Sequence, residues 1–424
     1  MSGILKAQTA LLLALAVLCP PGQALAQDAW WPALKKELWE NNPKLAAGRK
    51  KAEAADKIPD SKMALADPMI SAGIMSVPTD SFRLDQEEMT QKFVEFRQDV
   101  PAFSMRAANR RMAQAAAGAA RAELAMDAAM AAMELKMAVN EVIFTRRARA
   151  ILDDTGSLLD KLAQTTLAKY ASGKDAQTNA ILAQLESGKL QRQKLKLEER
   201  MELARIKINR LLGRDQAAPF PAPGEYAPGV ADGAGMADAE EMRRAPAVAM
   251  AQAMAREAEA AVEEAEASTA IMWTFSASYG QRDPSPDMPR PGLINVMAGA
   301  TIPLYKSGKQ AKVIAAARLA AMEKKDRLRD AELETRARIA SSRASLAQEE
   351  RMIALYDTGL IPQAALAAES AVAAYQLDRG EFSMALMNQM SLLDIRMDLE
   401  MSRMRRADLS AALEAQTGAG NMEE

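Results

Sequence analysis

The chain contains two copies of one pattern, and the second copy begins about 200 residues after the first. The segment 40–57, ENNPKLAAGRKKAEAADK, matches the segment 243–260, RRAPAVAMAQAMAREAEA. Three further matches follow in the same order: the segments after Pro101 and Pro303, the Asp-Thr-Gly triplets at 154–156 and 357–359, and the segments 168–177 and 373–382. Convergence on an alanine-rich composition explains shared alanine runs but not shared prolines and triplets. We therefore expect two copies of one structural unit.

Each half carries the same order of expected elements: a helix, two strands, a very long helix and a return helix. The helices are expected at 44–64, 104–172 and 176–213 in the first half, and at 238–268, 306–374 and 382–416 in the second. The strands are expected at 67–77, 89–100, 271–283 and 292–302. The fold class is therefore mainly α with a small β part.

The two longest helices exceed the size of ordinary globular elements. A helix over 104–172 is about 100 Å long at 1.5 Å per residue, whereas a typical globular helix has about 11–12 residues. The return helices carry apolar residues spaced four and three apart. This spacing predicts one narrow apolar stripe that packs against a neighbouring helix, with the rest of the helix surface exposed to solvent. These residues are Leu197, Met201, Ala204, Ile208 and Leu211, then Leu386, Met390, Leu393 and Met397.

The third expected strand alternates between apolar and small polar side chains, as a strand with two different faces does. Trp273, Phe275 and Tyr279 lie in the apolar row. Each strand is long enough to cross a bilayer at a tilt, but four strands are too few to close a barrel. We expect other copies of the chain to complete the barrel, with the apolar row facing lipid; the alternative is a small soluble sheet packed on helices. Alternation in the first strand pair is blurred, because Phe93, Val94 and Phe96 fall on both faces.

Composition argues against enzymes and against nucleic-acid binding. The 54 basic and 56 acidic residues nearly cancel, so no basic excess favours a nucleic acid. The chain has no histidine and a single cysteine, which removes histidine-based catalysis and most zinc chemistry. The Ser-Gly-Lys triplets at 172–174 and 307–309 lack the glycine that a phosphate-binding loop requires. We expect no catalysis, no cofactor and no metal site; the 28 methionines fit helix seams better than a path for soft metal ions.

The first residues resemble an export signal. Lys6 precedes an apolar run at 11–17, and Ala24-Leu25-Ala26 fits the cleavage pattern, so the mature chain is expected to begin at Gln27. Lipidation of Cys19 is the alternative, but the bulky Leu18 before it argues against that processing. No later apolar stretch of about 20 residues predicts a membrane-spanning helix. The expected divisions are a signal peptide (1–26), a first repeat (27–214), a Gly/Pro-rich linker (215–235), a second repeat (236–416) and a disordered tail (417–424).

The duplicated plan and its local patterns resemble the TolC-type outer-membrane efflux proteins, and the resemblance covers nearly the whole mature chain. The opening helix (NNPKLAAGRKKAEAA), both strand-to-helix junctions (VPAFSMRAANRRMAQAAA and IPLYKSGKQAKVIAAA) and both turns after the long helices are similar to that family. The segment LYDTGLIPQAALAAESAVAAYQ is similar to the heavy-metal-efflux branch.

The resemblance implies a homotrimer in the bacterial outer membrane. Each protomer would give four strands to one shared 12-stranded barrel in the lipid, and its helices to an α-barrel tunnel through the periplasm. Such a protein is a passive conduit for metal ions or small toxic compounds, and it docks on a periplasmic adaptor and an inner-membrane RND-type pump. The competing hypothesis is a periplasmic coiled-coil adaptor, which would have one helical hairpin flanked by strand-rich domains.

The resemblance also places functional residues at the turns after the long helices. The positions that would contact the adaptor are Tyr170, Gly173 and Lys174 in the first half, and Tyr375, Asp378, Arg379 and Gly380 in the second. In the second turn Asp378 occupies the place where the family pattern expects glycine. The positions that would narrow the tunnel are Met384, Met387, Asn179 and Glu381. A methionine ring would close by packing and drying rather than by charge.

Overall fold

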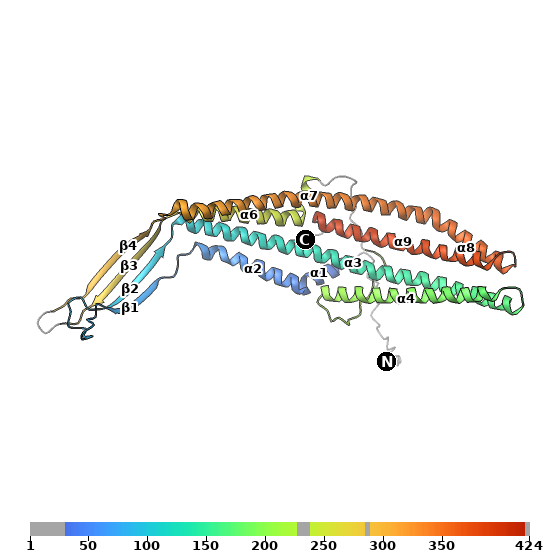
Figure 1. Ribbon diagram of the computed structural model, residues 1–424, viewed down its shortest axis with the longest axis horizontal. Coiled ribbons are helices and arrows are strands. Elements are labelled where there is room, and N and C mark those ends of the chain that lie inside the picture. Colours follow the sequence, from blue (N-terminus) through green and yellow to red (C-terminus); the bar gives the residue numbers. More distant parts are fainter. Residues whose placement is uncertain (1–29, 227–237, 285–288, 420–424) are drawn as a thin grey trace, which may run out of the picture.

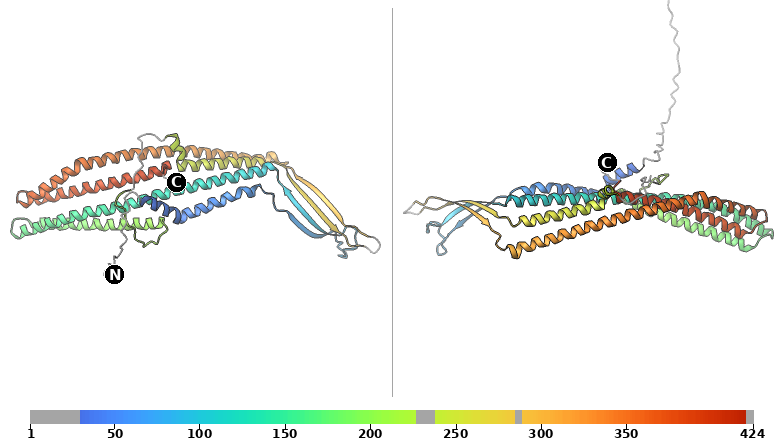
Figure 2. Two further views of the ribbon diagram at one scale, coloured as in Figure 1. Left: turned by 180° about the vertical axis from the view of Figure 1, so that it is seen from behind. Right: turned by 90° about the horizontal axis from the view of Figure 1, so that it is seen from above.

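The computed structural model describes residues 30–226, 238–284 and 289–419. The predicted signal peptide, Cys19 and the linker residues 227–235 lie outside this part of the chain. The described chain is long and narrow, with a small sheet at one end and two helical hairpins at the other (Figure 1). Both halves run the full length of the molecule side by side, as the two views in Figure 2 agree.

The first half contains α1 (Trp30–Asn41), α2 (Pro43–Met63), β1 (Met69–Met75), β2 (Gln91–Val100), α3 (Phe103–Ala171) and α4 (Gln177–Leu211). The second half contains α5 (Ala239–Arg244), α6 (Pro246–Ala267), β3 (Met272–Gln281), β4 (Leu293–Thr301), the π-helical turn η1 (Lys306–Gln310), α7 (Ala311–Leu355), the π-helical turn η2 (Tyr356–Leu360), α8 (Ile361–Gln376) and α9 (Phe382–Thr417). The duplicated order of helix, two strands, long helix and return helix is therefore present. The described chain has two long hairpins and one sheet, which is not the plan expected of an adaptor.

An equivalent glycine follows the return helix in each half. Gly213 follows α4 and Gly418 follows α9, and both have a left-handed backbone, with φ of 66° and 73°. A Cβ atom on Gly213 would collide with the backbone of Asn41, and one on Gly418 with the backbone of Arg244. Each return helix thus ends against the start of the short helix of its own half. Only glycine allows both this conformation and this approach.

Three helical features differ from the predictions. Helix α1 was not expected; Leu34 and Leu38, one turn apart, bury it against the core. The expected helix 238–268 is broken at Ala245, because Pro246 lacks the N–H that would continue the hydrogen-bond ladder. The expected helix 306–374 begins with η1 and is interrupted by η2.

The second π-helical turn has an identifiable cause. Pro362 follows the Asp-Thr-Gly triplet of the second half, and its ring cannot be accommodated by an unbroken α-helical ladder. Leu159 stands at the same distance after the first triplet, and α3 passes through that position as regular α-helix. A π-helical turn accommodates one extra residue, so it resolves the conflict without ending the helix. Among the described helices, none is both long enough and apolar enough to cross a membrane.

The four strands form one antiparallel sheet in the order β1-β2-β3-β4. The register aligns Ile70, Phe96, Ala277 and Val296 across the sheet, so their side chains share one face. The predicted row Trp273, Phe275 and Tyr279 lies on this face, with 45%, 48% and 55% of each residue exposed. The opposite face carries small polar residues of β3, of which Ser276 is buried.

The register also shows which face of the sheet each residue of the first strand pair occupies. Val94 is paired with Tyr279 and is exposed on the apolar face. Phe93 lies on the opposite face, where its neighbours across the strands are Gly73 and Gly280. A Cβ atom on Gly73 would lie 3.1 Å from the Phe93 ring, so this glycine leaves the space that the ring fills.

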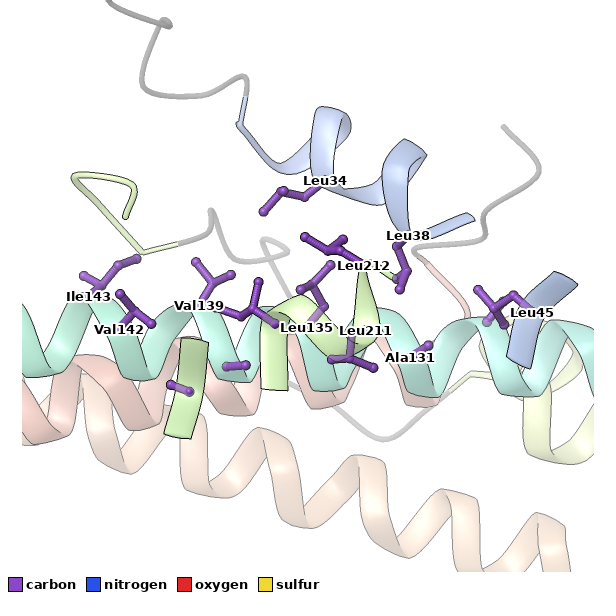
Figure 3. Close-up of a cluster of buried hydrophobic side chains, with 14 residues drawn as sticks. Leu34, Leu38, Leu45, Ala131, Leu135, Val139, Val142, Ile143, Leu211 and Leu212 are labelled. Atoms are coloured by element: carbon purple, nitrogen blue, oxygen red, sulfur yellow. The ribbon is translucent and has the colours of Figure 1, made fainter. Parts of the chain in front are cut away.

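Helix α3 packs against several other helices: it contacts α2 and α6 in its first part, and α4 and α9 towards the far end. One hydrophobic cluster lies where α1, α3 and α4 meet (Figure 3). Its largest buried side chains are Leu38, Leu45, Leu135, Ile143, Ile208 and Leu212. A second cluster continues from Phe144 to the hairpin ends, where Tyr375 and Phe382 close it.

A partly buried carboxyl lies between these helices. Asn140 of α3 donates to Asp408 Oδ1 of α9 at 2.9 Å, and Asn140 is itself fully buried. Burial raises the pKa of Asp408 to about 6; Glu141 adds to the rise, while Asn140 and Lys207 oppose it. The raised pKa means that ionised Asp408 destabilises the fold. This cost is absent below the ordinary pKa of about 4 and fully present once the pH exceeds about 6.

We expect Asp408→Asn to raise stability above pH 7 by roughly 1–2 kcal/mol, because it removes a poorly solvated charge and keeps the shape. The gain should fade between pH 6 and pH 4 as the native carboxyl takes up its proton. Thermal unfolding of the purified protein from pH 4 to pH 8 measures this gain. The matched control is Asp398→Asn, on an exposed position of the same helix. A gain of equal size at every pH would contradict this assignment.

Candidate functional site at the hairpin ends

The turn between α3 and α4 and the turn between α8 and α9 lie side by side at the end of the molecule farthest from the sheet (Figures 1 and 2). Both long helices end in the same way. Lys174 N–H donates to Lys169 O at 2.8 Å, and Arg379 N–H donates to Ala374 O at 2.9 Å. These bonds close a Schellman motif, in which one residue takes the left-handed conformation.

The left-handed residue is Gly173 in the first turn, with φ of 73°, and Asp378 in the second, with φ of 57°. The aspartate therefore does occupy the glycine position of the turn. Asp is among the few non-glycine residues that tolerate this conformation. Gly380 serves a different purpose, because a Cβ atom there would lie 3.0 Å from the Ala374 Cβ. Glycine at 380 is needed for space rather than for a left-handed backbone.

Asp378 joins the second turn to the first. Its Oδ1 atom lies 2.6 Å from Lys169 Nζ, and its Oδ2 atom lies 3.4 Å from Lys174 Nζ. Hydrogen bonding and charge from Lys169, followed by Lys174, lower the pKa of Asp378. The carboxylate therefore stays ionised across the neutral and mildly acidic range. We call these three side chains the tip bridge.

Tyr375 forms a second connection between the turns. The residue is only 4% exposed, and its hydroxyl donates to Asp175 Oδ2 at 2.5 Å and lies 2.9 Å from Thr166 Oγ1. Burial and the bond to Asp175 raise the pKa of Tyr375 to about 12. Burial would raise the pKa of Asp175, but the hydrogen bonds from Tyr375 and Asn179 outweigh it and lower that pKa. The hydroxyl is thus neutral and the carboxyl charged, the pairing that gives a strong hydrogen bond.

The ring of Tyr375 is fixed from two sides. The Lys169 ammonium lies 4.1 Å from the ring centre and also donates to the Tyr375 carbonyl. The ring of Phe382 meets that of Tyr375 edge to face, with centres 5.6 Å apart. The Lys169 contacts tie the second hairpin to the first, whereas Phe382, at the start of α9, fixes the ring from within the second hairpin.

A cleft of about 640 Å³ lies between the two turns. Its lining includes the following residues: Lys169, Lys174, Asp175, Asn179, Tyr375, Asp378, Gly380, Glu381, Phe382 and Ser383. In the described part of the chain, no group of three or more His, Cys, Asp or Glu residues could hold a metal ion. The cleft holds charges of both signs that are largely engaged with each other. The arrangement binds two backbone turns together and offers an exposed, charged rim around them.

The predicted docking residues fall into two groups. Tyr170, Gly173, Lys174, Arg379 and Gly380 are exposed. Asp378 is half exposed within the tip bridge, whereas Tyr375 lies in the interior, so the surface open to another molecule excludes its side chain.

The predicted constriction residues also fall into two groups, one lining the cleft and one on the exposed side of α9. Asn179 and Glu381 line the cleft. Met384 and Met387 are 50% and 59% exposed, while Ala385 and Leu386 between them are buried. Both methionines therefore lie on the side of α9 away from the core.

Four residues that matter here were not predicted: Lys169, Asp175, Thr166 and Phe382. One signal for Lys169 was available, because two lysines flank the first turn and either could pair with an acidic residue of the second turn. Asp175 and Thr166 carry no such signal, since their partner Tyr375 lies about 200 residues away in the sequence.

We expect Tyr375→Phe to destabilise the hairpin ends by roughly 1–2 kcal/mol, because Asp175 would lose its buried donor. Faster amide hydrogen exchange at 166–176 and 371–383 would report this change. Tyr170→Phe is the control: Tyr170 occupies the equivalent place in the first half, is 44% exposed and should leave exchange unaltered. Equal exchange in both variants would show that the Tyr375 hydroxyl contributes nothing.

No family model and no curated protein sequence matches the chain. Solved structures match over nearly all of it. The outer-membrane channel OprN is 15% identical, with 92% of this chain and 90% of that chain covered and a TM-score of 0.79. The outer membrane protein VceC from Vibrio cholerae is 18% identical, with 94% and 98% covered and a TM-score of 0.78. CusC, whose structures describe transmembrane channel formation, is 13% identical, with 92% of each chain covered and a TM-score of 0.76.

The chain therefore has the fold of the outer-membrane channels. The similar TM-scores do not distinguish between these channels, so the likeness favours no branch within the fold.

Proposed function

We propose that this protein is the outer-membrane channel of a tripartite efflux system and belongs to the TolC-type family. Three copies assemble around one axis, and the assembly is a passive conduit rather than an enzyme. Its sheet lies in the outer membrane and its helices form a tunnel in the periplasm. The cargo is a metal ion or a small toxic compound that an inner-membrane RND-type pump delivers; the sequence pattern of the second long helix favours the heavy-metal branch.

The observation that carries this proposal is the four-stranded sheet. Strands β1 and β4 lie at its edges and have no further partner in the described chain. One face carries exposed apolar side chains, including Val296 at 78% and Ile294 at 76% exposure. Open edges are excluded from lipid, where each backbone group must be paired. Pairing β4 of one copy with β1 of the next closes a barrel of 12 strands, four from each of three copies.

The helices support the same assembly. By the duplication, α4 corresponds to α9, and α7 with α8 corresponds to α3. Within the chain α9 packs along α3. Packing α4 of one copy against α7 and α8 of the next would repeat that contact. Both surfaces carry exposed leucines: Leu185, Leu195 and Leu203 on α4, at 53%, 57% and 60%, and Leu333 and Leu366 on α7 and α8, at 57% and 67%.

The hairpin ends would meet the periplasmic adaptor. The exposed surface of the two turns, with Tyr170, Lys174 and Arg379, is the part of the molecule farthest from the sheet. Gly173, Asp378 and Gly380 shape this surface through the backbone. The tunnel would be narrowest just beyond it, at Met384 and Met387, with Asn179 and Glu381 beside them.

The barrel is tested with two substitutions at neighbouring positions of β3. Ala277→Arg places a cation on the apolar face, and Ser278→Arg places it on the polar face. A cation in lipid costs roughly 2–4 kcal/mol per strand near the bilayer centre. We expect Ala277→Arg to deplete the trimer in purified outer membranes, and Ser278→Arg to insert at the wild-type level. Equal insertion of both variants would contradict a lipid-facing sheet.

The constriction is tested by single-channel conductance of the purified protein in a planar bilayer. We expect Met384→Ala/Met387→Ala to open more often or more widely than the wild type, because the apolar ring that dries the tunnel is smaller. A wild-type monomer without conductance would overturn the proposed channel. Pores that the substitution leaves unchanged would keep the channel and move its narrowest point towards Asp378 or Glu381.

A further inference from the structure

Exposed apolar residues continue past the end of β4. On this strand Ile294 and Val296 lie on the same face of the sheet as the apolar row of β3. Two more apolar residues, Ile302 and Leu304, follow at the same spacing beyond Thr301, the last residue of the strand. They are 59% and 80% exposed. The apolar surface therefore reaches into the link between β4 and η1.

The residues directly after Leu304 combine an aromatic ring with two positive charges. Tyr305 is 77% exposed, and Lys306 and Lys309 of η1 are exposed as well. Neither lysine side chain forms a hydrogen bond or an ion pair with any residue that the structure describes. We call Leu304, Tyr305, Lys306 and Lys309 the junction patch. It presents apolar, aromatic and cationic groups in that order along the chain.

The cations at the matching junction of the first half are engaged by their own chain. Arg106 of α3 donates to the Met63 carbonyl at 3.1 Å, and Arg110 lies 3.1 Å from Asp60. Helix α2 supplies both partners. By the duplication α6 corresponds to α2, but among the described residues it supplies no such partner to the two lysines of η1. The two halves have therefore diverged at this junction.

The duplication also indicates that the junction patch stays accessible in the proposed trimer. Phe103 aligns with Tyr305, because each stands two residues after the shared proline. Strand β2, which leads to Phe103, is paired with β3, as β4 would be paired with β1 of the next chain. Phe103 is nevertheless 66% exposed, and Ser104, at the place of Lys306, is exposed too. We therefore expect the ring of Tyr305 and the Lys306 ammonium to remain uncovered.

We propose that the junction patch binds an anionic phospholipid in the periplasmic leaflet of the outer membrane. This inference rests on the proposed function, which places β4 in lipid and η1 just below the bilayer. Leu304 then contacts the acyl chain, and the ring of Tyr305 lies at the level of the headgroups. Lys306 and Lys309 extend their ammonium groups to the phosphate.

The charges of the patch select the class of lipid. Two cations without carboxylate partners favour a headgroup with net negative charge over a zwitterionic one, whose own ammonium they repel. The exposed Leu304 beside them favours a phospholipid over free phosphate, because only the lipid brings an acyl chain. Three copies of the chain carry three such sites.

Trp273 reports on the lipid next to the patch. It lies on the apolar face and is paired with Ala300 of β4, whereas the other three tryptophans lie in α1. The purified protein is reconstituted in mixtures of phosphatidylglycerol and phosphatidylcholine, with one of the two brominated on its acyl chains. Quenching of the Trp273 fluorescence then gives the relative affinity of the two lipids at this surface. Trp273→Phe supplies the background from α1.

We expect the wild type to favour phosphatidylglycerol roughly tenfold at 0.1 M salt and to lose this preference at 1 M salt. Lys306→Gln/Lys309→Gln should lower the preference to about one, because both cations are removed. The matched control is Lys50→Gln/Lys196→Gln, which removes two exposed charges without ion pairs from α2 and α4. It should keep the wild-type preference.

Equal quenching by the two brominated lipids in the wild type would overturn the inference and leave the proposed channel intact. A preference that Lys306→Gln/Lys309→Gln retains in full would overturn it as well. If neither brominated lipid quenches Trp273, the sheet does not face lipid, and the proposed function fails together with this inference.

Discussion

The arrangement of the helices depends on α3, a single helix of 69 residues against which α1, α2, α4, α6 and α9 pack. Its buried residues change along its length. Between 103 and 131 they are all alanine, and α2 and α6 pack closely on this part. From Leu135 onwards larger apolar residues dominate, and the clusters around Ile143 and Leu152 join α4 and α9 to the same helix. Small side chains permit close helix approach near the sheet, and large ones fill the wider space towards the hairpin ends.

Charged contacts orient the helices rather than hold them together. Most ion pairs on the helix surfaces are exposed, and such pairs contribute about 0–1 kcal/mol each. The buried pair of Lys136 and Glu414 differs, because the ammonium also lies 4.5 Å from the ring centre of Trp31. That contact places α1, α3 and α9 relative to each other. Removing one partner would leave a charge buried in the interior, so this pair specifies the geometry at the middle of the molecule.

The sequence was sufficient to predict the duplicated plan, the four strands and the approximate ends of the long helices, because these depend on periodicity and local turn chemistry. It was not sufficient where the outcome depends on register or distant contact. Phe93 could be assigned to a face only once its pairing with Gly73 was known. The burial of Tyr375 depends on Asp175, from the other half of the chain. The break at η2 had a local signal in Pro362, but periodicity alone does not distinguish a π-helical turn from a helix end.

The π-helical turn η2 also changes the geometry of the second long helix. One inserted residue rotates every later side chain by about 100° around the helix axis. The apolar residues of α7 therefore follow one helical spacing along the sequence, and those of α8 follow a spacing shifted by one residue. The backbone itself is continuous through η2. In coiled-coil terms the phase is reset at a single point. A wall of helices can then curve, as α7 and α8 do in Figure 1, while each segment keeps its own apolar face towards its neighbours.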